Sequence, residues 1–213
     1  MKIAVLISGR GSNLQSLIDA CNDDDFPAEI SLVISNKADA YGLKRASDAS
    51  IPTKVFNQKD FSTREDFDAA MSDAIEASGA EFICLAGFMR LLSDNFVKTW
   101  HDRLVNIHPS LLPAFKGLHV HEQAIERGVR FSGCTVHFVR SAMDEGPILM
   151  QAVVPVLPDD TPDSLAARVL EQEHIVYPQA LRIIAERKVR VSGERAIIDG
   201  HKTPNGSLIN PEK

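Results

Sequence analysis

Short apolar runs alternate with amphipathic stretches along the chain. The runs are rich in β-branched residues and have the length of buried strands; they cover residues 3–7, 30–34, 53–56, 82–86, 104–107, 134–139 and 148–156. Between the early runs, the pattern predicts helices near residues 13–21, 40–49 and 64–78. In the last of these, Phe67, Met71 and Ile75 recur at the helical spacing, so they share one face.

Strand–helix–strand alternation requires right-handed crossovers and gives a parallel sheet that is covered on both faces. The alternation of strands and helices ends after about residue 100, where the chain is interrupted by Pro109, Pro113, Gly117 and Gly128. Two strand-like runs then follow, separated by a turn at residues 144–147. The sequence therefore predicts an α/β fold: a doubly wound, mostly parallel Rossmann-like sheet with helices on both faces and a mixed C-terminal half.

The last part of the chain is expected to hold one long helix and a tail. Thr161 followed by Pro162 is typical of a helix start, with an N-cap residue before a proline in the first turn. We expect this helix to reach towards Arg187, with a kink before Pro178. The pattern predicts one domain over residues 1–200 and a loose polar tail over residues 201–213.

Composition excludes several classes of protein. The chain has 213 residues, of which 44% are hydrophobic and 24% charged, so neither disorder nor a coiled coil describes the whole chain. The net charge of −6 argues against non-specific binding to nucleic acid or to an anionic membrane. No apolar run approaches the roughly 20 residues of a membrane span, and the N-terminal run is too short for a signal peptide. We expect a cytoplasmic protein with no membrane partner.

The three cysteines, Cys21, Cys84 and Cys134, lie far apart, and their odd number favours reduced thiols in a reducing compartment. A catalytic thiol is the alternative, but a buried structural role is the commoner one for a cysteine inside an apolar run such as that around Cys84.

Residues 8–13 follow the first strand directly and open a helix, as an anion-binding turn would. Leu14 stands where a dinucleotide-binding motif has its third glycine, and the second strand ends in Ser35, Asn36 and Lys37 without an acidic residue. No Gly-Lys-Ser/Thr follows either, so neither NAD nor ATP is indicated. The alternative is a tight turn that merely needs glycine. The phosphate-binding hypothesis is a phosphomonoester held by Gly11, Ser12 and Asn13.

Ligands of doubly wound sheets bind beyond the carboxyl ends of the strands, where the strand order reverses. If the second and third strands lie on one side of the first, the fourth lies on the other. The ends of strands one and four then flank one crevice, and Gly87 and Arg90 are expected to face the loop around Gly11.

A polar group ends the fifth strand. Asn106 and His108 are two residues apart on an extended segment, so their side chains share one face. An amide and an imidazole suit an oxyanion stabiliser and an acid–base group, although a histidine at a strand end is more often structural. Pro109 and Pro113 stiffen the exit loop. A carboxylate from the turn at Asp144 can reach back to the imidazole and favour its charged form, although acidic turns are usually just solvated.

Lys116, His119 and His121 follow this strand and add a third polar cluster. Together with His108 they raise the question of a metal site, but no cysteine or glutamate stands at a familiar ligand spacing. We therefore expect no metal, and read these residues either as loop polarity or as groups that steer an anionic substrate.

Three motifs carry a specific resemblance over roughly residues 1–200. They are Gly9-x-Gly11-Ser12-Asn13, Ala86-Gly87-Phe88-Met89-Arg90-Leu91-Leu92 and Asn106-Ile107-His108-Pro109-Ser110-Leu111-Leu112-Pro113, supported by Val136-His137-Phe138-Val139, Asp144-x-Gly146-Pro147 and Gln172-Glu173-His174. These motifs resemble those of the phosphoribosylglycinamide formyltransferases, a folate-dependent branch of the formyltransferase superfamily.

The resemblance implies formyl transfer from 10-formyltetrahydrofolate, a co-substrate, to the amine of 5′-phosphoribosylglycinamide. It implies a phosphate-binding half (residues 1–100) and a catalytic, folate-binding half (residues 101–200), in a monomer or homodimer whose partners are small molecules. The implied catalytic residues are Asn106, His108 and Asp144; the ribonucleotide residues are Gly11, Ser12, Asn13, Gly87 and Glu173; the folate residues are Arg64, Met89, Arg90, Leu91, Leu92, Asn106, Arg140, Ser141, Ala142, Met143 and Asp144.

Other readings compete with this one. A methionyl-tRNA formyltransferase would carry a further basic C-terminal domain, and a formyltetrahydrofolate hydrolase usually has an extra N-terminal domain; the acidic chain, starting at its first strand, favours neither. A non-catalytic mononucleotide-binding module would need none of Asn106, His108 and Asp144.

Overall fold

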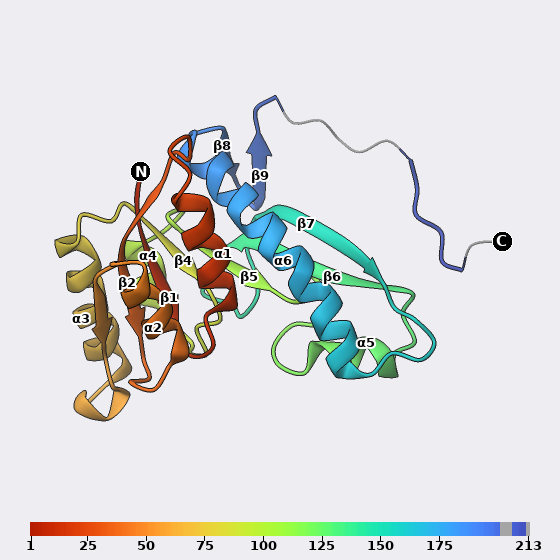
Figure 1. The fold of residues 1–213 in the computed structure, drawn as a ribbon, viewed down its shortest axis with the longest axis horizontal. Coiled ribbons are helices and arrows are strands. Elements are labelled where there is room, and N and C mark those ends of the chain that lie inside the picture. Colours follow the sequence, from red (N-terminus) through yellow and green to blue (C-terminus); the bar gives the residue numbers. More distant parts are fainter. Residues whose placement is uncertain (201–205, 212–213) are drawn as a thin grey trace.

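The computed structural model describes residues 1–200 and 206–211. Its centre is a seven-stranded sheet in the order β3-β2-β1-β4-β5-β6-β7 (Figure 1). The first five strands are parallel; β6 pairs antiparallel with β5, and β7 pairs antiparallel with β6. The strands are β1 (Lys2–Ile7), β2 (Glu29–Ser35), β3 (Thr53–Val55), β4 (Phe82–Leu85), β5 (Leu104–His108), β6 (Phe131–Phe138) and β7 (Ile148–Pro155).

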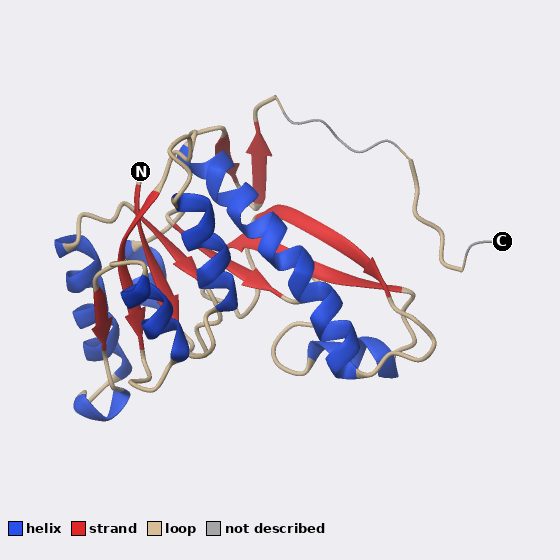
Figure 2. Ribbon diagram, in the orientation of Figure 1, coloured by secondary structure: helices blue, strands red, loops and turns tan. Residues whose placement is uncertain are grey.

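Helices cover both faces of this sheet (Figure 2). They are α1 (Ser12–Cys21), α2 (Tyr41–Asp48), α3 (Arg64–Ala77), α4 (Asp94–Thr99), α5 (Val120–Glu126) and α6 (Pro162–Ala185), with a short 3₁₀ helix, η1 (Gln58–Asp60), before α3. The predicted fold class is confirmed, including the mixed C-terminal half. The predicted position of strand four, on the far side of strand one from strands two and three, is also confirmed.

The alternation of side chains along each strand divides the interior into two cores. On one face, Val105, Ile107 and Val136 pack with the apolar stripes of α1 and α6. On the other face, Ala4, Leu6 and Ile83 pack with α3 and α4. We call these the α6 face and the α3 face. Beyond Leu104 at the start of β5, no residue of β5, β6 or β7 is among the buried residues of the core under α3 and α4, within the described ranges.

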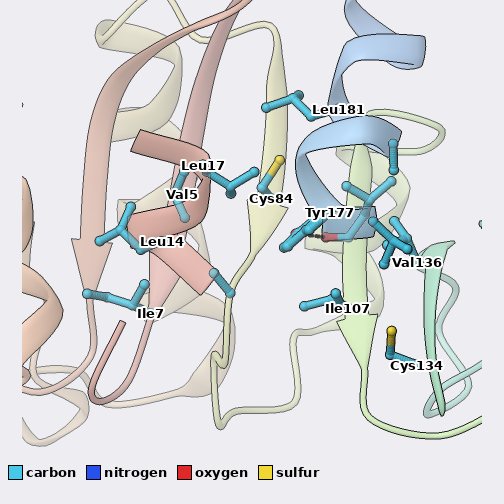
Figure 3. Packing of buried hydrophobic residues seen from close by; sticks show 14 of the residues in the cluster. Val5, Ile7, Leu14, Leu17, Cys84, Ile107, Cys134, Val136, Tyr177 and Leu181 are labelled. Atoms are coloured by element: carbon cyan, nitrogen blue, oxygen red, sulfur yellow. Dashed lines mark hydrogen bonds between the residues drawn. The ribbon is translucent and has the colours of Figure 1, made fainter. Parts of the chain in front are cut away.

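Helix α6 is the longest element and anchors one core (Figure 3). The predicted start is confirmed: the Thr161 hydroxyl accepts a hydrogen bond from the Ser164 N–H, and Pro162 follows in the first turn. The helix continues through Pro178 to Ala185 as one element. Buried Tyr177 donates a hydrogen bond of 2.9 Å to the Leu85 carbonyl oxygen, which ties α6 to the end of β4.

The hydrophobic pattern of the sequence did not predict some of the elements. These are η1, the short helices α4 and α5, and a hairpin of β8 (Val189–Ser192) and β9 (Arg195–Ile198). Residues 201–205 and 212–213 of the predicted tail lie outside the described residues, whereas Asn210 hydrogen-bonds the Arg130 carbonyl oxygen. Within the described part of the chain, no helix combines the length and apolar character that crossing a membrane requires.

Candidate active site

Four polar side chains share the α3 face of β5 and β6. Leu104 belongs to the α3-face core and Val105 to the α6-face core, so Asn106 and His108 project onto the α3 face. The antiparallel register sets His137 opposite Asn106 and Thr135 opposite His108. The site therefore lies on a face of the sheet, where His108 and Thr135 contact the loop that follows β5, as well as at a strand end. The strand-end interpretation of the sequence did not anticipate this position.

The imidazole of His108 contacts oxygen atoms at both ring nitrogens. Its side chain is almost fully buried, and Nδ1 lies 3.5 Å from Asp144 Oδ1. Nε2 lies 2.9 Å from the Phe115 carbonyl oxygen. The predicted approach of Asp144 to His108 is thus present. The other carboxylate oxygen of Asp144 accepts a hydrogen bond of 2.7 Å from the Gly117 N–H, so the loop after β5 holds both members of the pair.

His137 orients the amide of Asn106. His137 Nδ1 lies 3.1 Å from the Phe138 carbonyl oxygen, so Nδ1 carries the proton and Nε2 is left as an acceptor. The amide nitrogen of Asn106 lies 3.5 Å from that Nε2. Burial lowers the pKa of His137, which keeps the ring neutral and able to accept. The sequence reasoning missed this partner, although the two-residue alternation along β6 could have placed it.

The loop before α1 has a shape that requires glycine. Gly11 has φ of +68°, and a Cβ there would lie 2.7 Å from the Cα of Gly42. Arg45 fixes the same loop, because its Nε donates a hydrogen bond of 3.0 Å to the Arg10 carbonyl oxygen. Within the described residues, no side chain makes a capping hydrogen bond at the N-terminus of α1. The first N–H groups of this helix therefore have no side-chain acceptor there, as an anion site needs.

Asn13 and Glu173 meet beside this loop although 160 residues separate them. The amide nitrogen of Asn13 donates a hydrogen bond of 2.6 Å to Glu173 Oε2. Both side chains are buried, and burial raises the pKa of Glu173, an effect that the bond from Asn13 partly opposes. The amide oxygen of Asn13 is buried without a hydrogen-bond partner within the described residues. A buried acceptor without a partner calls for an explanation, and it leaves the amide oxygen of Asn13 able to accept one further hydrogen bond.

Residues 87–93, which we call the 87–93 segment, connect β4 to α4. Met89 and Leu91 are 67% and 62% exposed, so the segment presents two apolar side chains to solvent. Arg90 points the other way: its guanidinium lies 4.3 Å above the ring of Phe67, on the α3 face. The prediction that Arg90 faces the Gly11 loop is therefore wrong, because the aromatic ring offers the cation a contact on the opposite side of the sheet.

The remaining predicted folate residues fall into two places. Arg64 is exposed at the start of α3, near the 87–93 segment through their shared neighbour Asp68. Arg140 pairs with Asp102, with 2.8 Å between Nη2 and Oδ1. Its side chain is thus engaged in tethering the 140–147 loop. Ser141, Ala142 and Met143 are exposed on that loop.

Comparison with known proteins assigns the chain to a family. The Formyl transferase family model matches residues 1–181. The phosphoribosylglycinamide formyltransferase of Haemophilus influenzae is 45% identical over 209 residues, which are 98% of this chain and 99% of that protein. The chain belongs to the formyl transferase family.

Two further proteins are similar to this chain. Glycinamide ribonucleotide transformylase 1 from Symbiobacterium toebii superposes with a TM-score of 0.91, at 46% identity and 93% coverage of both chains. The trifunctional purine biosynthetic protein adenosine-3 of Drosophila melanogaster is 52% identical over 195 residues, or 91% of this chain. The chain spans only 14% of that larger protein.

The thiols of this formyl transferase family member are structural in character. Burial raises the pKa of Cys84 and of Cys134 to about 12 and that of Cys21 to about 11. Such thiols are almost entirely protonated at neutral pH, and nucleophilic thiol chemistry needs the thiolate. In the part of the chain that the structure describes, no three His, Cys, Asp or Glu side chains gather as a metal would require.

Proposed function

We propose that the protein transfers a formyl group from 10-formyltetrahydrofolate to the primary amine of 5′-phosphoribosylglycinamide, a step of purine biosynthesis. The observation that carries the proposal is the buried His108–Asp144 pair beside Asn106, in a chain that matches a named phosphoribosylglycinamide formyltransferase over nearly its whole length. A non-catalytic binding module would need neither this buried imidazole–carboxylate pair nor Asn106 beside it.

The ribonucleotide binds at the start of α1. The N–H groups of Gly11, Ser12 and Asn13 bind its phosphate, because the helix N-terminus is uncapped and favours an anion. Glu173 accepts hydrogen bonds from the ribose hydroxyls, and its bond to Asn13 sets its position. The backbone near Gly87, which is exposed at the end of β4, contacts the glycinamide end.

The folate lies along the 87–93 segment and the 140–147 loop. Met89, Leu91 and Leu92 supply apolar contacts for its ring system, and Arg64 faces the acidic tail of the molecule. The loop of Arg140, Ser141, Ala142, Met143 and Asp144 closes over the site, with backbone contacts carrying most of the binding because Arg140 is engaged by Asp102.

The chemistry is direct transfer. The amine attacks the formyl carbon, a C–N bond forms, and the carbonyl oxygen becomes an oxyanion. The bond from that carbon to the folate nitrogen then breaks; the amine loses one proton and the folate nitrogen gains one. Donors from Asn106 and His108 stabilise the oxyanion, and one such donor typically lowers the barrier by about 3–4 kcal/mol.

The geometry of His108 suits this role. Both ring nitrogens face oxygen acceptors, which matches a ring that carries a proton on each. The bond from Nε2 to Phe115 is short and fixes the ring, whereas the contact from Nδ1 to Asp144 is long. We therefore assign the Nδ1 proton to the developing oxyanion and give Asp144 the task of stabilising the charged ring.

A single set of assays tests the proposal. Purified protein is incubated with 10-formyltetrahydrofolate, with and without 5′-phosphoribosylglycinamide, and tetrahydrofolate, formyl product and formate are measured. Formyl product that depends on the ribonucleotide is the expected result. Formate release without the ribonucleotide would indicate a hydrolase instead, and ribonucleotide binding without any product would indicate a binding module.

A further inference from the structure

The mechanism makes no use of one buried carboxylate. Asp68 lies in α3 between the core residues Phe67 and Met71 and is only 1% exposed. Burial raises the pKa of this carboxyl group, so its charged form is costly at this position. An apolar side chain would satisfy a helix face packed on a sheet, and the carboxylate therefore needs another explanation.

Asp68 reaches the end of the 87–93 segment. Its Oδ2 accepts a hydrogen bond of 2.6 Å from the Ser93 N–H, and both residues are buried. Ser93 is also the N-cap of α4, because its hydroxyl accepts a bond from the Phe96 N–H. The carboxylate thus fixes the residue at which the segment ends and the helix begins.

Two cations act on the same carboxylate. The charges of Arg90 and Arg64 both act on Asp68 and favour its ionised form. The guanidinium of Arg90 is stacked on Phe67, the neighbour of Asp68 in α3. Arg90 Nε and Asp68 Oδ1 are buried without hydrogen-bond partners within the described residues, so the charges rather than direct bonds hold this arrangement. Turning Arg90 inward leaves Met89 and Leu91 outward.

A second hydrogen bond holds the segment near its other end, at Met89. The Met89 N–H donates a hydrogen bond of 2.8 Å to the Ser8 hydroxyl, which in turn donates to Asn36 Oδ1 at 2.6 Å. Between the two anchors, residues 87–92 form neither helix nor strand, and no backbone–backbone hydrogen bond involves them in the described ranges. The shape of the segment therefore depends on its two ends.

We propose that Asp68 is a positioning residue for the folate: by holding Ser93 and turning Arg90 inward, it sets the 87–93 segment in the shape that receives the folate ring system. This inference rests on the proposed function, which assigns the segment to the folate. Asp68 does not touch the substrate, so its loss acts on folate binding and leaves the ribonucleotide site, which is built on α1 and α6, in place.

Asp68→Asn tests the proposal, because the amide keeps the shape and an acceptor for Ser93 but removes the charge. Asp73→Asn is the matched control, since it removes the same charge from an exposed position of the same helix. We expect the KM for 10-formyltetrahydrofolate to rise at least tenfold in Asp68→Asn, and the KM for the ribonucleotide to stay within twofold. Asp73→Asn should match the wild type in both.

A second variant, Asp68→Ala, and a direct binding measurement complete the test. Asp68→Ala should raise the folate KM further, and calorimetric titration with tetrahydrofolate should show the same loss of affinity without turnover. An unchanged folate KM in an active Asp68→Asn enzyme overturns the inference, as does an equal rise in both KM values together with a lower Tm. If the wild-type protein forms no formyl product, the proposed function fails first and the inference falls with it.

Discussion

At the scale of single residues, the site is built from pairs that one change can break. His108 is held between the Phe115 carbonyl oxygen and Asp144, and Asn106 is oriented by His137. The members of each pair come from different elements, so each pair exists only in the folded chain. Substitutions at these positions should therefore change activity and stability separately.

His108→Ala and Asp144→Asn should each reduce kcat by about 100-fold or more, since each removes a donor to the oxyanion or the charge that supports that donor. The fold should survive, because neither side chain belongs to an apolar core. Steady-state kinetics and circular dichroism check both statements. Wild-type turnover in either variant would remove that residue from the mechanism.

Glu173→Gln should weaken binding of the ribonucleotide and leave the free protein at least as stable as the wild type. The amide keeps an acceptor for Asn13, but it no longer carries a buried charge, so the free protein should be at least as stable as the wild type. Burial raises the pKa of Glu173 above its unfolded value, so the wild type loses stability as pH rises from about 4 through the folded pKa. Thermal melts across pH should show Glu173→Gln gaining on the wild type there, while its ribonucleotide KM rises about tenfold or more.

At the scale of elements, the sequence predicted those with strong periodicity. Every strand of the large sheet and helices α1, α2, α3 and α6 match apolar runs or stripes. Helices α4 and α5 have only six and seven residues, too short for a periodic pattern, and the β8–β9 hairpin has no fully buried residue. The sequence also could not predict the orientation of Arg90, because its contact with Phe67 depends on how the 87–93 segment folds back on α3.

The start of α6 offers a prediction at this scale. Asp160 accepts hydrogen bonds of 2.7 and 2.8 Å from Arg168 and also accepts from the Leu157 N–H, so the pKa of this carboxyl group lies well below its usual range. Asp160→Asn should cost about 2 kcal/mol at pH 7, or roughly 4–8 °C in Tm. The difference should shrink as pH falls below about 4, where the unfolded carboxyl group becomes protonated. A constant difference down to acidic pH would contradict the ion-pair account.

At the scale of the whole molecule, the proposed site draws its residues from both faces of one sheet. The proposed ribonucleotide residues Asn13 and Glu173 come from helices on the α6 face, whereas Asn106 and His108 project onto the α3 face. Sequence motifs named the members of both groups, but only the register of β5 against β6 reveals that Asn106 and His108 share a face with His137 and Thr135. The register pairs residues that lie far apart in the sequence, so a local hydrophobic pattern does not predict it.

Ligand binding should stabilise the whole chain, because the ribonucleotide site joins α1 to α6 across 160 residues of sequence. At 100 times its Kd, the ribonucleotide should add about 2.7 kcal/mol, or roughly 5–11 °C in Tm. Differential scanning fluorimetry with 5′-phosphoribosylglycinamide measures this shift. Glu173→Gln at the same concentration should show a smaller rise, and an equal rise would place the ligand elsewhere.

The alternation along β5 also limits how this enzyme can change. Asn106 and His108 project onto the α3 face, where we place the reaction, whereas Val105 and Ile107 are interior residues under α6. Inserting or deleting one residue within this strand would exchange the two sets, burying an amide and an imidazole beneath the long helix and exposing aliphatic side chains to the substrate. Length variation should therefore be tolerated in the turns between elements and rejected within β5 and β6, so that loss of folding and loss of activity coincide there.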